Sequence, residues 1–404
     1  MDSSIASWDR LLSFLPPDLD AKAREWRAYE RLRGFDCAED LLRTLLDYAA
    51  SGASLLDVAA ASTAAGKPLS HSALHERLVA AEHFLHFLFI HVAGYGSEAK
   101  PAQGTLRAID ATVLCGPGAT GSELLLHAMM ELGSGRIVSM RLTRSNVGEH
   151  AGLHFGGAES FAIADRAYGS ASNLRALGEA GSGYLVRLTR CAMRFHDAKG
   201  RRVRLAELEA GVRADAPCDM IVSAPVKPPG AKGTAWIRSR RTVWVKTRLI
   251  GIRIPNGSVV WYATSLAREE LDAAGVGELY RSRWQVELMF KRFKSLGGLG
   301  KLKSRKNGPS AKAWVYAKLL VAALAQRLVR PNGPREEGLP GNPRAHSAWA
   351  RMRLALGVVA QLVAGTRRLL LSSDERAMLR MRPTTRKRAL QQCSLPKHTS
   401  ASRA

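Results

Sequence analysis

The spacing of apolar residues along the chain changes near residue 104. Before this point apolar positions recur at helical spacing, as in 40–50 and 75–93, which is typical of amphipathic helices. After it, short apolar or alternating runs bounded by turn residues predict strands. The strands are predicted at 104–114, 122–132, 135–143, 159–169 and 182–190, and helical stretches at 147–153 and 170–181. A helical N-terminal region is therefore followed by a mixed α/β core.

Two further changes of pattern divide the rest of the chain. Segments 193–208 and 247–265 look like β-hairpins, the second with the strong turn signal Asn256-Gly257. Beyond residue 300 helical patterns return on both sides of a Pro/Gly-rich link, and we expect the helix before the link to complete the core. The predicted regions are 1–100 (helical), 101–190 (first part of the core), 191–262 (inserted β domain), 263–330 (second part of the core) and 331–404 (helical and basic).

Charge indicates the class of partner. The 404 residues carry a formal net charge of +25, with extra Lys and Arg density at 238–253 and 380–388. Such an excess of positive charge predicts a polyanionic partner. A ribosomal or membrane-surface protein could be equally basic, but 46% hydrophobic residues indicate folded domains with cores of their own.

Cysteine spacing and the apolar runs argue against a secreted or membrane protein. The five cysteines form no CxxC pair, so neither a zinc site nor a disulfide framework is predicted. The N-terminus lacks a basic stretch followed by a long apolar one. The longest apolar run, 314–325, is interrupted by Lys318 and is too short to cross a bilayer. We expect a cytoplasmic protein with no membrane partner.

Residues 54–81 have the pattern of two short helices around a turn at 66–68. A helix-turn-helix would place its second helix, capped by Ser70 or Ser72, in a DNA major groove. The candidate base readers on that helix are His71, His75 and Arg77. An ordinary helical hairpin in a small bundle has the same pattern. The sequence leaves both interpretations open, and 1–100 is a candidate DNA-binding region.

The stretch 280–294 combines acidic, basic and phenolic side chains at helical spacing. At about 100° per residue, one arc of roughly 60° holds Tyr280, Arg283, Glu287 and Lys294. Apolar residues occupy the opposite side, so the predicted helix is amphipathic. A glutamate flanked by cations is suited to holding a metal ion next to phosphate. The alternative is a solvated helix face with an ordinary Arg/Glu pair.

Two aspartates of the predicted core offer partners for Glu287. Asp110 lies inside the first predicted strand among apolar residues, where an unpaired carboxylate would be costly to bury. Asp165 ends the segment FAIAD, a common position for active-site groups in α/β sheets. Taken singly, Asp110 also fits an exposed strand face and Asp165 a turn. Converging with Glu287, they would repel one another unless magnesium or manganese neutralised them.

The order of these residues resembles a known family. Asp110, then Asp165 within ADRAYG, then a Tyr-x2-Arg-x3-Glu-x6-Lys helix is similar to the DDE transposases of bacterial insertion sequences, in the branch with the YREK signature. The resemblance spans about 104–300, and all four signature positions match. It implies an α/β fold with an RNase H-like mixed sheet, flanking helices, an inserted β domain, and helical N- and C-terminal regions.

The resemblance also implies metal-dependent cut-and-paste transposition. Asp110 would bridge two Mg²⁺ or Mn²⁺ ions, and Asp165 and Glu287 would each complete one coordination sphere. The phosphates of the DNA end would be held by Tyr280, Arg283 and Lys294. The implied partners are the terminal inverted repeats of its own element, the target DNA, and a second copy in a homodimer on paired ends. In related enzymes the freed 3′-hydroxyl first forms a hairpin end.

The predicted inserted domain offers a second surface for DNA. In 236–248 basic and aromatic residues alternate as on a strand, which suits phosphates and an unstacked base. Phosphate contacts are predicted for Arg238, Arg240 and Arg241. Base stacking is considered for Trp236, Trp244, Trp261 and Trp284, although aromatic residues in strands more often fill a core.

Other functions account for part of this pattern. A metal-dependent nuclease or resolvase on the same core would share the three carboxylates. A non-catalytic DNA-binding regulator would explain the charge and the N-terminal helices but not the acidic triad. A decayed, inactive copy is a third possibility, although the triad and the signature are intact.

Overall fold

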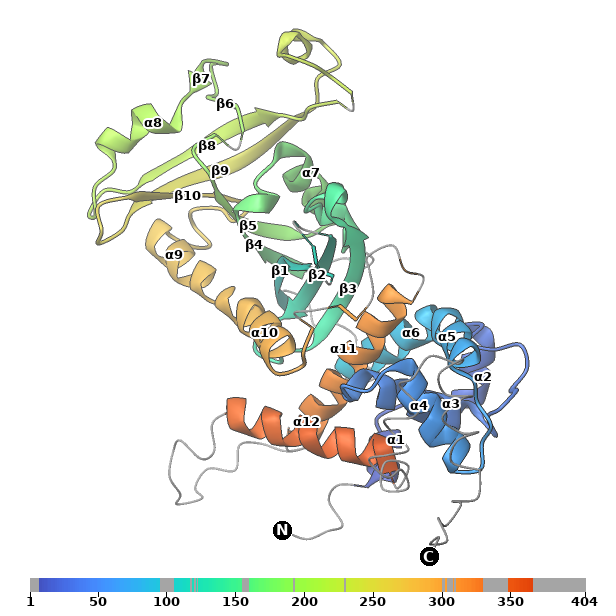
Figure 1. Cartoon of the computed structure of the whole chain (residues 1–404). Coiled ribbons are helices and arrows are strands. Elements are labelled where there is room, and N and C mark those ends of the chain that lie inside the picture. The colour runs from blue at the N-terminus through green and yellow to red at the C-terminus, as the bar shows by residue number, and fades with distance from the viewer. Residues whose placement is uncertain are drawn as a thin grey trace, which may run out of the picture. The chain divides into compact units, whose positions relative to one another are not determined.

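The chain forms two compact units in the computed structural model (Figure 1). Met1–Val92 and Asn307–Ala404 belong to one, which we call the helical unit, and Ala93–Lys306 form the other, which we call the sheet unit. The structure describes residues 7–94, 105–116, 118–119, 121, 123–154, 160–191, 193–228, 230–299, 302–303, 308, 310–329 and 348–365. The basic segment 380–388 lies outside these residues.

The helical unit packs around a long buried helix, α11. Most of α11 is buried, and it packs against α3 and α12. It therefore belongs to the helical unit, whereas the sequence predicted that it completes the α/β core. The helices described in this unit are α1 (Trp8–Leu12), α2 (Leu19–Glu25), α3 (Ala38–Ala50), α4 (Leu55–Ala64), α5 (His71–Ala80), α6 (Glu82–Ala93), α11 (Ala311–Val329) and α12 (Ala348–Ala364). In the described part of the chain, no helix combines the length and apolar character needed to cross a membrane.

Helices α4 and α5 form the helix pair that the sequence predicted. Gly66 has a φ of 83° in the turn between them, a conformation that favours glycine. The Ser70 hydroxyl accepts a backbone N–H from the first turn of α5 at 3.1 Å and so caps that helix. The Arg77 guanidinium donates to the Arg31 carbonyl, while His71 is exposed. Binding of α5 in a DNA groove stays a prediction.

Among its described residues, the sheet unit is built on one mixed sheet of ten strands, ordered β3-β2-β1-β4-β5-β10-β9-β8-β6-β7. Its first five strands are β1 (Thr105–Leu114), β2 (Leu124–Glu131), β3 (Ile137–Arg144), β4 (Ser160–Ala164) and β5 (Gly183–Leu188). The β1–β2 and β2–β3 pairs are antiparallel, whereas β1–β4 and β4–β5 are parallel. This order and these directions confirm the predicted RNase H-like fold.

Alternate residues of β4 face two different hydrophobic cores. Ala162 and Ala164 pack with residues of α7 (Ala171–Glu179), whereas Ile163 packs with residues of α9 (Ala273–Arg281). Because strand side chains alternate between faces, α7 and α9 cover opposite faces of the sheet. The other α-helices described in this unit are α8 (Leu205–Leu208) and α10 (Trp284–Ser295), and α10 contacts β1 and β2.

The predicted inserted domain is β structure that extends the core sheet. Its strands are β6 (Phe195–His196), β7 (Arg202–Val203), β8 (Cys218–Pro225), β9 (Trp244–Arg253) and β10 (Val259–Thr264). Strand β10 pairs antiparallel with both β5 and β9, so hydrogen bonding is continuous across the expected domain boundary. The two predicted hairpins form, and Gly257, with a φ of 83°, makes the turn between β9 and β10.

The basic and aromatic segment 236–248 differs from the alternating strand that we predicted. Ala235–Arg238 is a short 3₁₀ helix, and β9 begins only at Trp244. Serine, glycine and threonine residues around this arginine cluster favour turns over the regular hydrogen bonding of a strand. Three side chains of this connection were predicted to contact phosphates, and all three are exposed: Arg238, Arg240 and Arg241.

The four tryptophans considered for base stacking have different surroundings. Trp261 is 1% exposed within the core of the sheet unit, so its ring has no open face for a base. Trp284 and Trp244 are 59% and 42% exposed. Trp236 is half-buried, and its indole N–H donates to the Gly233 carbonyl at 3.1 Å.

Arg248 on β9 has a structural role. Its side chain is 3% exposed and forms a two-point pair with Asp219 on β8, with donor–acceptor distances of 2.9 and 2.8 Å. The same guanidinium donates to three backbone carbonyls in 266–271, the segment that leads into α9. The pair therefore fixes the entry to α9. Arg248 lies in the basic segment 236–248 that the sequence predicts to face DNA, but its burial contradicts a DNA contact for this residue.

Replacing Asp219 with asparagine should destabilise the sheet unit by about 3 kcal/mol near pH 7, because it leaves the Arg248 charge buried without its partner. Hydrogen bonds from Arg248, and to a smaller extent from Arg268, hold the pKa of Asp219 below its usual range. This stabilisation is present above about pH 4 and is lost as pH falls through the folded-state pKa. Urea unfolding as a function of pH measures it.

The matched control is Asp215→Asn. Asp215 pairs with Arg213, but the two side chains are 75% and 70% exposed. We expect this change to cost less than about 0.5 kcal/mol. Equal costs for the two substitutions would contradict the structural role of the Asp219–Arg248 pair.

Candidate active site

Asp110 and Asp165 lie side by side because β1 and β4 are adjacent parallel strands. Ile109 pairs in register with Ala164, so the next residue along each strand is one of the two aspartates. The preceding residues Ile109 and Ala164 both belong to the core that includes α7. Because side chains alternate along a strand, the two carboxylates point to the opposite face of the sheet, which α9 and α10 cover. The family resemblance implied this meeting, and the register supplies its cause.

Asp110 is held by one backbone and one side-chain donor. Its Oδ1 accepts the Ala111 N–H at 2.9 Å, and its Oδ2 accepts from Arg283 at 3.1 Å. Burial raises the pKa of Asp110 to about 6 although the Arg283 charge opposes the rise, and the Asp165 charge adds to it. A cation bound beside Asp110 would favour the ionised carboxylate and lower this pKa.

A third carboxylate, Glu149, joins the two aspartates, and the sequence did not reveal it. One oxygen from each of Asp110, Glu149 and Asp165 lies within 4.8 Å of the other two. Burial raises the pKa of Glu149 to about 7, and the charges of Asp165 and Asp110 add to this. Its Oε2 is buried without a hydrogen-bond partner among the described residues.

Glu149 reaches the site from a turn that we predicted to be a helix. The stretch forms two 3₁₀ turns instead, Ser145–Val147 and Ala151–Leu153, separated at Gly148 with a φ of 69°. Asn173 of α7 fixes this turn, because its amide donates to the Glu149 carbonyl at 3.2 Å and accepts the Ala151 N–H at 2.9 Å. Of the sequence signals, only Gly148 pointed to a sharp turn here.

The predicted signature helix is interrupted. Helix α9 ends at Arg281 and α10 begins at Trp284, where we had predicted one continuous helix. Ser282 and Arg283 keep helical dihedral angles but form hydrogen bonds to the residue three positions earlier. The Ser282 hydroxyl also donates to the Leu279 carbonyl at 2.7 Å, which helps to tighten the turn.

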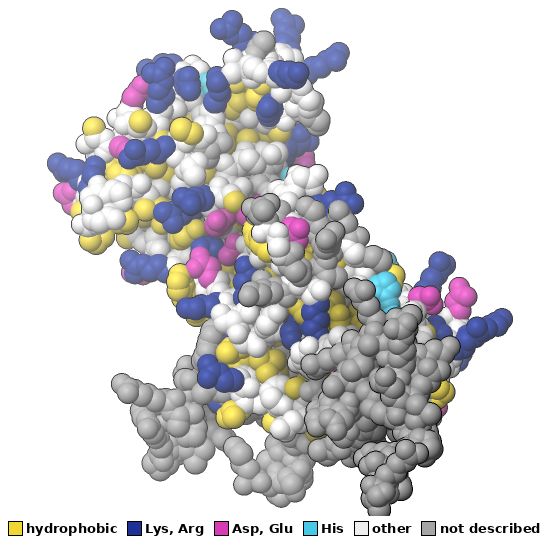
Figure 2. Space-filling model, viewed as in Figure 1, with side chains coloured by type: hydrophobic (Ala, Val, Ile, Leu, Met, Phe, Trp, Pro, Cys, Tyr) yellow, Lys and Arg dark blue, Asp and Glu magenta, His cyan; other side chains and the backbone are white. Residues whose placement is uncertain are grey.

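Arg283 joins the signature segment to the core aspartates. Its side chain is 12% exposed, and its guanidinium donates both to Asp110 and to Glu287. Glu287 is therefore next to the acidic cluster, but it is bound to Arg283 and is outside the group of three close carboxylates. Figure 2 shows acidic side chains gathered beside the junction of α9 and α10.

The other two signature residues lie on either side of Arg283. The Arg283 guanidinium is 5.6 Å from the centroid of the Tyr280 ring. The Tyr280 ring also packs at 5.1 Å from the ring of Tyr262, and burial raises its pKa to about 12. Lys294 lies about 10 Å further along the helix than Glu287. It makes no ion pair with any described residue, and burial lowers the pKa of its amine.

The donor set fits a hard divalent cation. Three carboxylate oxygens that crowd within 4.8 Å repel one another, and a cation at their centre would remove this repulsion. Tyr168 lies near the same cluster: burial raises its pKa well above the usual range, and Glu149, Asp110 and Asp165 add to the rise. Asp110, Glu149 and Asp165 are thus the residues that the geometry offers as metal ligands.

The family model described as "Transposase DDE domain" matches residues 101–324, more than half of the chain. The chain belongs to this family of DDE transposases. The matched range contains Asp110, Glu149, Asp165 and Glu287. Enzymes of this family act on DNA with divalent metal ions, and the structure contains a carboxylate cluster that could hold such an ion.

Similarity over most of the chain to named transposases supports the same assignment. The "Putative transposase InsL for insertion sequence element IS186A" of Escherichia coli (strain K12) is 30% identical over 358 residues, covering 82% of this chain and 96% of the relative. The "Transposase for insertion sequence element IS421" of Escherichia coli is 30% identical over 359 residues, with the same coverage. The chain is a transposase, as the sequence predicted.

Proposed function

We propose that this transposase moves its element by a cut-and-paste reaction. It binds the terminal inverted repeats, hydrolyses one DNA strand at each end, and joins the freed 3′-hydroxyl to target DNA. The convergence of Asp110, Asp165, Glu149 and Glu287 around Arg283 carries this proposal. The chain carries a net charge of +25, and we propose that its exposed cations bind DNA during the reaction, on the nucleoid in the cytoplasm.

We propose that Asp110, Asp165 and Glu287 are catalytic and that Mg²⁺ or Mn²⁺ is the cofactor, with two ions per site. Bound ions of this kind activate a water or 3′-hydroxyl nucleophile and stabilise the leaving oxygen. The chain's own contribution is to hold the carboxylates: β1 and β4 fix the two aspartates in register, and α10 presents Glu287. Glu149 adds a fourth carboxylate that either coordinates directly or orients the others.

We infer that Arg283 exchanges partners when DNA binds. In the structure it neutralises both Asp110 and Glu287, which would otherwise repel each other. A phosphate of the DNA end offers the same two-point geometry as a carboxylate. Transfer of the guanidinium to that phosphate would free both carboxylates for metal. Tyr280 and Lys294 would contact the same strand.

The exposed cations and aromatic rings suggest further DNA contacts. We propose that Arg238, Arg240 and Arg241 contact phosphates, since all three are exposed. Base stacking is proposed for Trp284, which directly follows Arg283, and considered for Trp244 and Trp236. We also propose that the reaction passes through a hairpin intermediate, that a homodimer holds the paired DNA ends, and that α5 binds in a DNA groove.

The direct test uses purified transposase and a DNA fragment carrying the element's ends with Mg²⁺. We expect nicks at the ends, with hairpin products resolved on denaturing gels, and joined products when target DNA is added. A fragment with scrambled ends is the control. Cleavage that ignores the end sequence would indicate a nuclease, and end binding without cleavage would indicate a regulator. Either result would contradict the proposal.

A further inference from the structure

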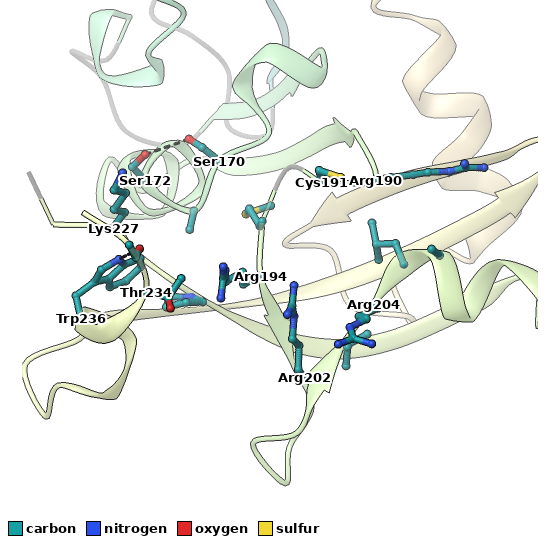
Figure 3. Close-up of a pocket in the computed structure, with 17 residues that line it drawn as sticks. Ser170, Ser172, Arg190, Cys191, Arg194, Arg202, Arg204, Lys227, Thr234 and Trp236 are labelled. Atoms are coloured by element: carbon teal, nitrogen blue, oxygen red, sulfur yellow. Dashed lines mark hydrogen bonds between the residues drawn. The ribbon is translucent and has the colours of Figure 1, made fainter. Parts of the chain in front are cut away.

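The sheet unit contains a second polar site, a cavity of about 760 Å³ that the mechanism above does not use. Its walls come from the start of α7, the segment after β5, the β6–β7 hairpin, and the connection between β8 and β9 (Figure 3). No Asp or Glu is among the lining residues. The lining cations are Arg190, Arg194, Arg202, Arg204 and Lys227.

Three of these cations have no ion-pair partner in the described part of the chain. Arg190 pairs with Glu209, and Arg204 pairs with Glu207. Arg194, Arg202 and Lys227 form no such pair, so the cavity keeps an excess of three positive charges. All three side chains are exposed to solvent, and like charges gathered along one hollow favour the binding of an anion.

The rest of the lining suits an extended phosphate ester. Ser170 and Ser172 place hydroxyls and the N-terminus of α7 at the wall, where backbone N–H groups favour negative charge. Trp236 forms another part of the wall and offers an aromatic surface. A lone phosphate ion would fill little of this volume, because one water occupies only about 30 Å³. A hollow of this size and charge suits a larger molecule that carries several phosphates or phosphodiesters.

The cavity lies close to the carboxylates along the chain. Ser170 follows Asp165 by five residues, which span at most about 18 Å even when fully extended. One strand of duplex DNA advances 3.4 Å per nucleotide, so this limit corresponds to about five nucleotides. The wall of the cavity at Ser170 therefore lies within about five nucleotides of Asp165.

We propose that this cavity binds the phosphodiester backbone of one DNA strand a few nucleotides from the cleaved bond, with Arg194, Arg202 and Lys227 holding its phosphates and Trp236 packing against a sugar or base. The proposal rests on the proposed function for the identity of the cleaved DNA. It adds a specific set of phosphate contacts that is separate from Tyr280, Arg283 and Lys294.

Equilibrium binding of a fluorescein-labelled duplex from the element's end tests the phosphate contacts. With EDTA present no cleavage occurs, so binding is measured apart from catalysis. The double variant Arg194→Gln/Arg202→Gln should bind about tenfold or more weakly near 0.15 M salt. The slope of log K against log salt should become shallower by about two. Lys227→Gln, on a different wall, should change the slope by about one.

The matched control is Lys199→Gln/Arg213→Gln, which removes the same charge from exposed positions outside the cavity. At this salt concentration charges are screened within roughly 8 Å, so the control should stay within about twofold of the wild type. Circular dichroism confirms that each variant is folded. Equal losses of DNA affinity in the cavity variants and in the control variant would overturn the proposal.

Cys191 gives a readout that needs no substitution. It is exposed and lines the cavity, whereas Cys218 is half-buried and outside the lining. We expect saturating DNA to slow alkylation of Cys191 at least about tenfold, measured by mass spectrometry with Cys218 as the internal reference. Inorganic phosphate and a nucleoside monophosphate should not protect it. Protection by these small anions but not by DNA would show a free phosphate-ester site and overturn the assignment to a DNA strand.

The two proposals fail separately. If the wild type cleaves element ends while the pocket variants bind DNA with unchanged slope, the cavity assignment is wrong and the proposed function stands. If the pocket variants lose the predicted phosphate contacts but the wild type cuts no end, the cavity assignment stands and the cleavage proposal is wrong.

Discussion

Replacing Asp165 with asparagine is expected to lower the rate of metal-dependent end cleavage by about a thousandfold or more. Loss of a charged metal ligand removes several kcal/mol of transition-state stabilisation, and each 1.4 kcal/mol corresponds to roughly tenfold in rate. Asparagine keeps the shape of the side chain and can still accept the Ala167 N–H, as Oδ1 of Asp165 does at 2.9 Å. The fold around it should therefore survive.

Single-turnover cleavage of labelled end DNA measures this effect. Glu179→Gln is the matched control, because Glu179 is an exposed acid on α7 whose ion-pair partner among the described residues is Arg175. It should cleave at close to the wild-type rate, and both variants should bind DNA with unchanged salt dependence. Near-normal cleavage by the Asp165 variant would remove this residue from the catalytic set.

Replacing Glu287 with glutamine is expected to have an effect of similar size. In the structure Glu287 accepts a hydrogen bond from Arg283 and lies outside the group of three close carboxylates. We propose that it becomes a metal ligand once DNA draws Arg283 away. Glutamine would keep the side-chain volume and a hydrogen bond to Arg283, so the loss would report coordination rather than packing.

Comparing Glu287→Gln with Glu149→Gln shows which of the two glutamates is the third metal ligand. If Glu149 mainly orients the ligands, its substitution should weaken metal dependence and cleavage by about 10- to 100-fold, less than the Glu287 change. Titration of cleavage with Mg²⁺ separates a loss of metal affinity from a loss of maximal rate. A larger effect at Glu149 than at Glu287 would make Glu149 the third ligand and Glu287 a partner that holds Arg283.

The strands and the two aspartates were predictable because each depends on local pattern. The apolar runs predicted the five strands β1 to β5, and Asp165 at the end of FAIAD marked a functional strand end. Their meeting depends on the parallel register of Ile109 and Ala164, which the sequence does not contain. The family resemblance supplied that step, and the structure explains it.

Glu149, the cavity and the continuous sheet depend on tertiary structure. Glu149 approaches the aspartates through a turn held by Asn173, 24 residues later in the chain. Arg194, Arg202 and Lys227 look like scattered surface cations until β6, β7 and the connection after β8 bring them to one cavity. The pairing of β10 with β5 likewise depends on residues far apart in the sequence, so 191–262 appeared to be a separate domain.

Iron-directed cleavage of the polypeptide tests the central claim most directly. Fe²⁺ replaces Mg²⁺ at oxygen-ligand sites, and with ascorbate and peroxide it releases radicals that cut the nearby backbone. We predict cuts clustered near residues 110, 149, 165 and 287, suppressed by excess Mg²⁺ and absent in Asp165→Asn. Cuts elsewhere, or the same cuts in the Asp165 variant, would contradict a metal site formed by these carboxylates.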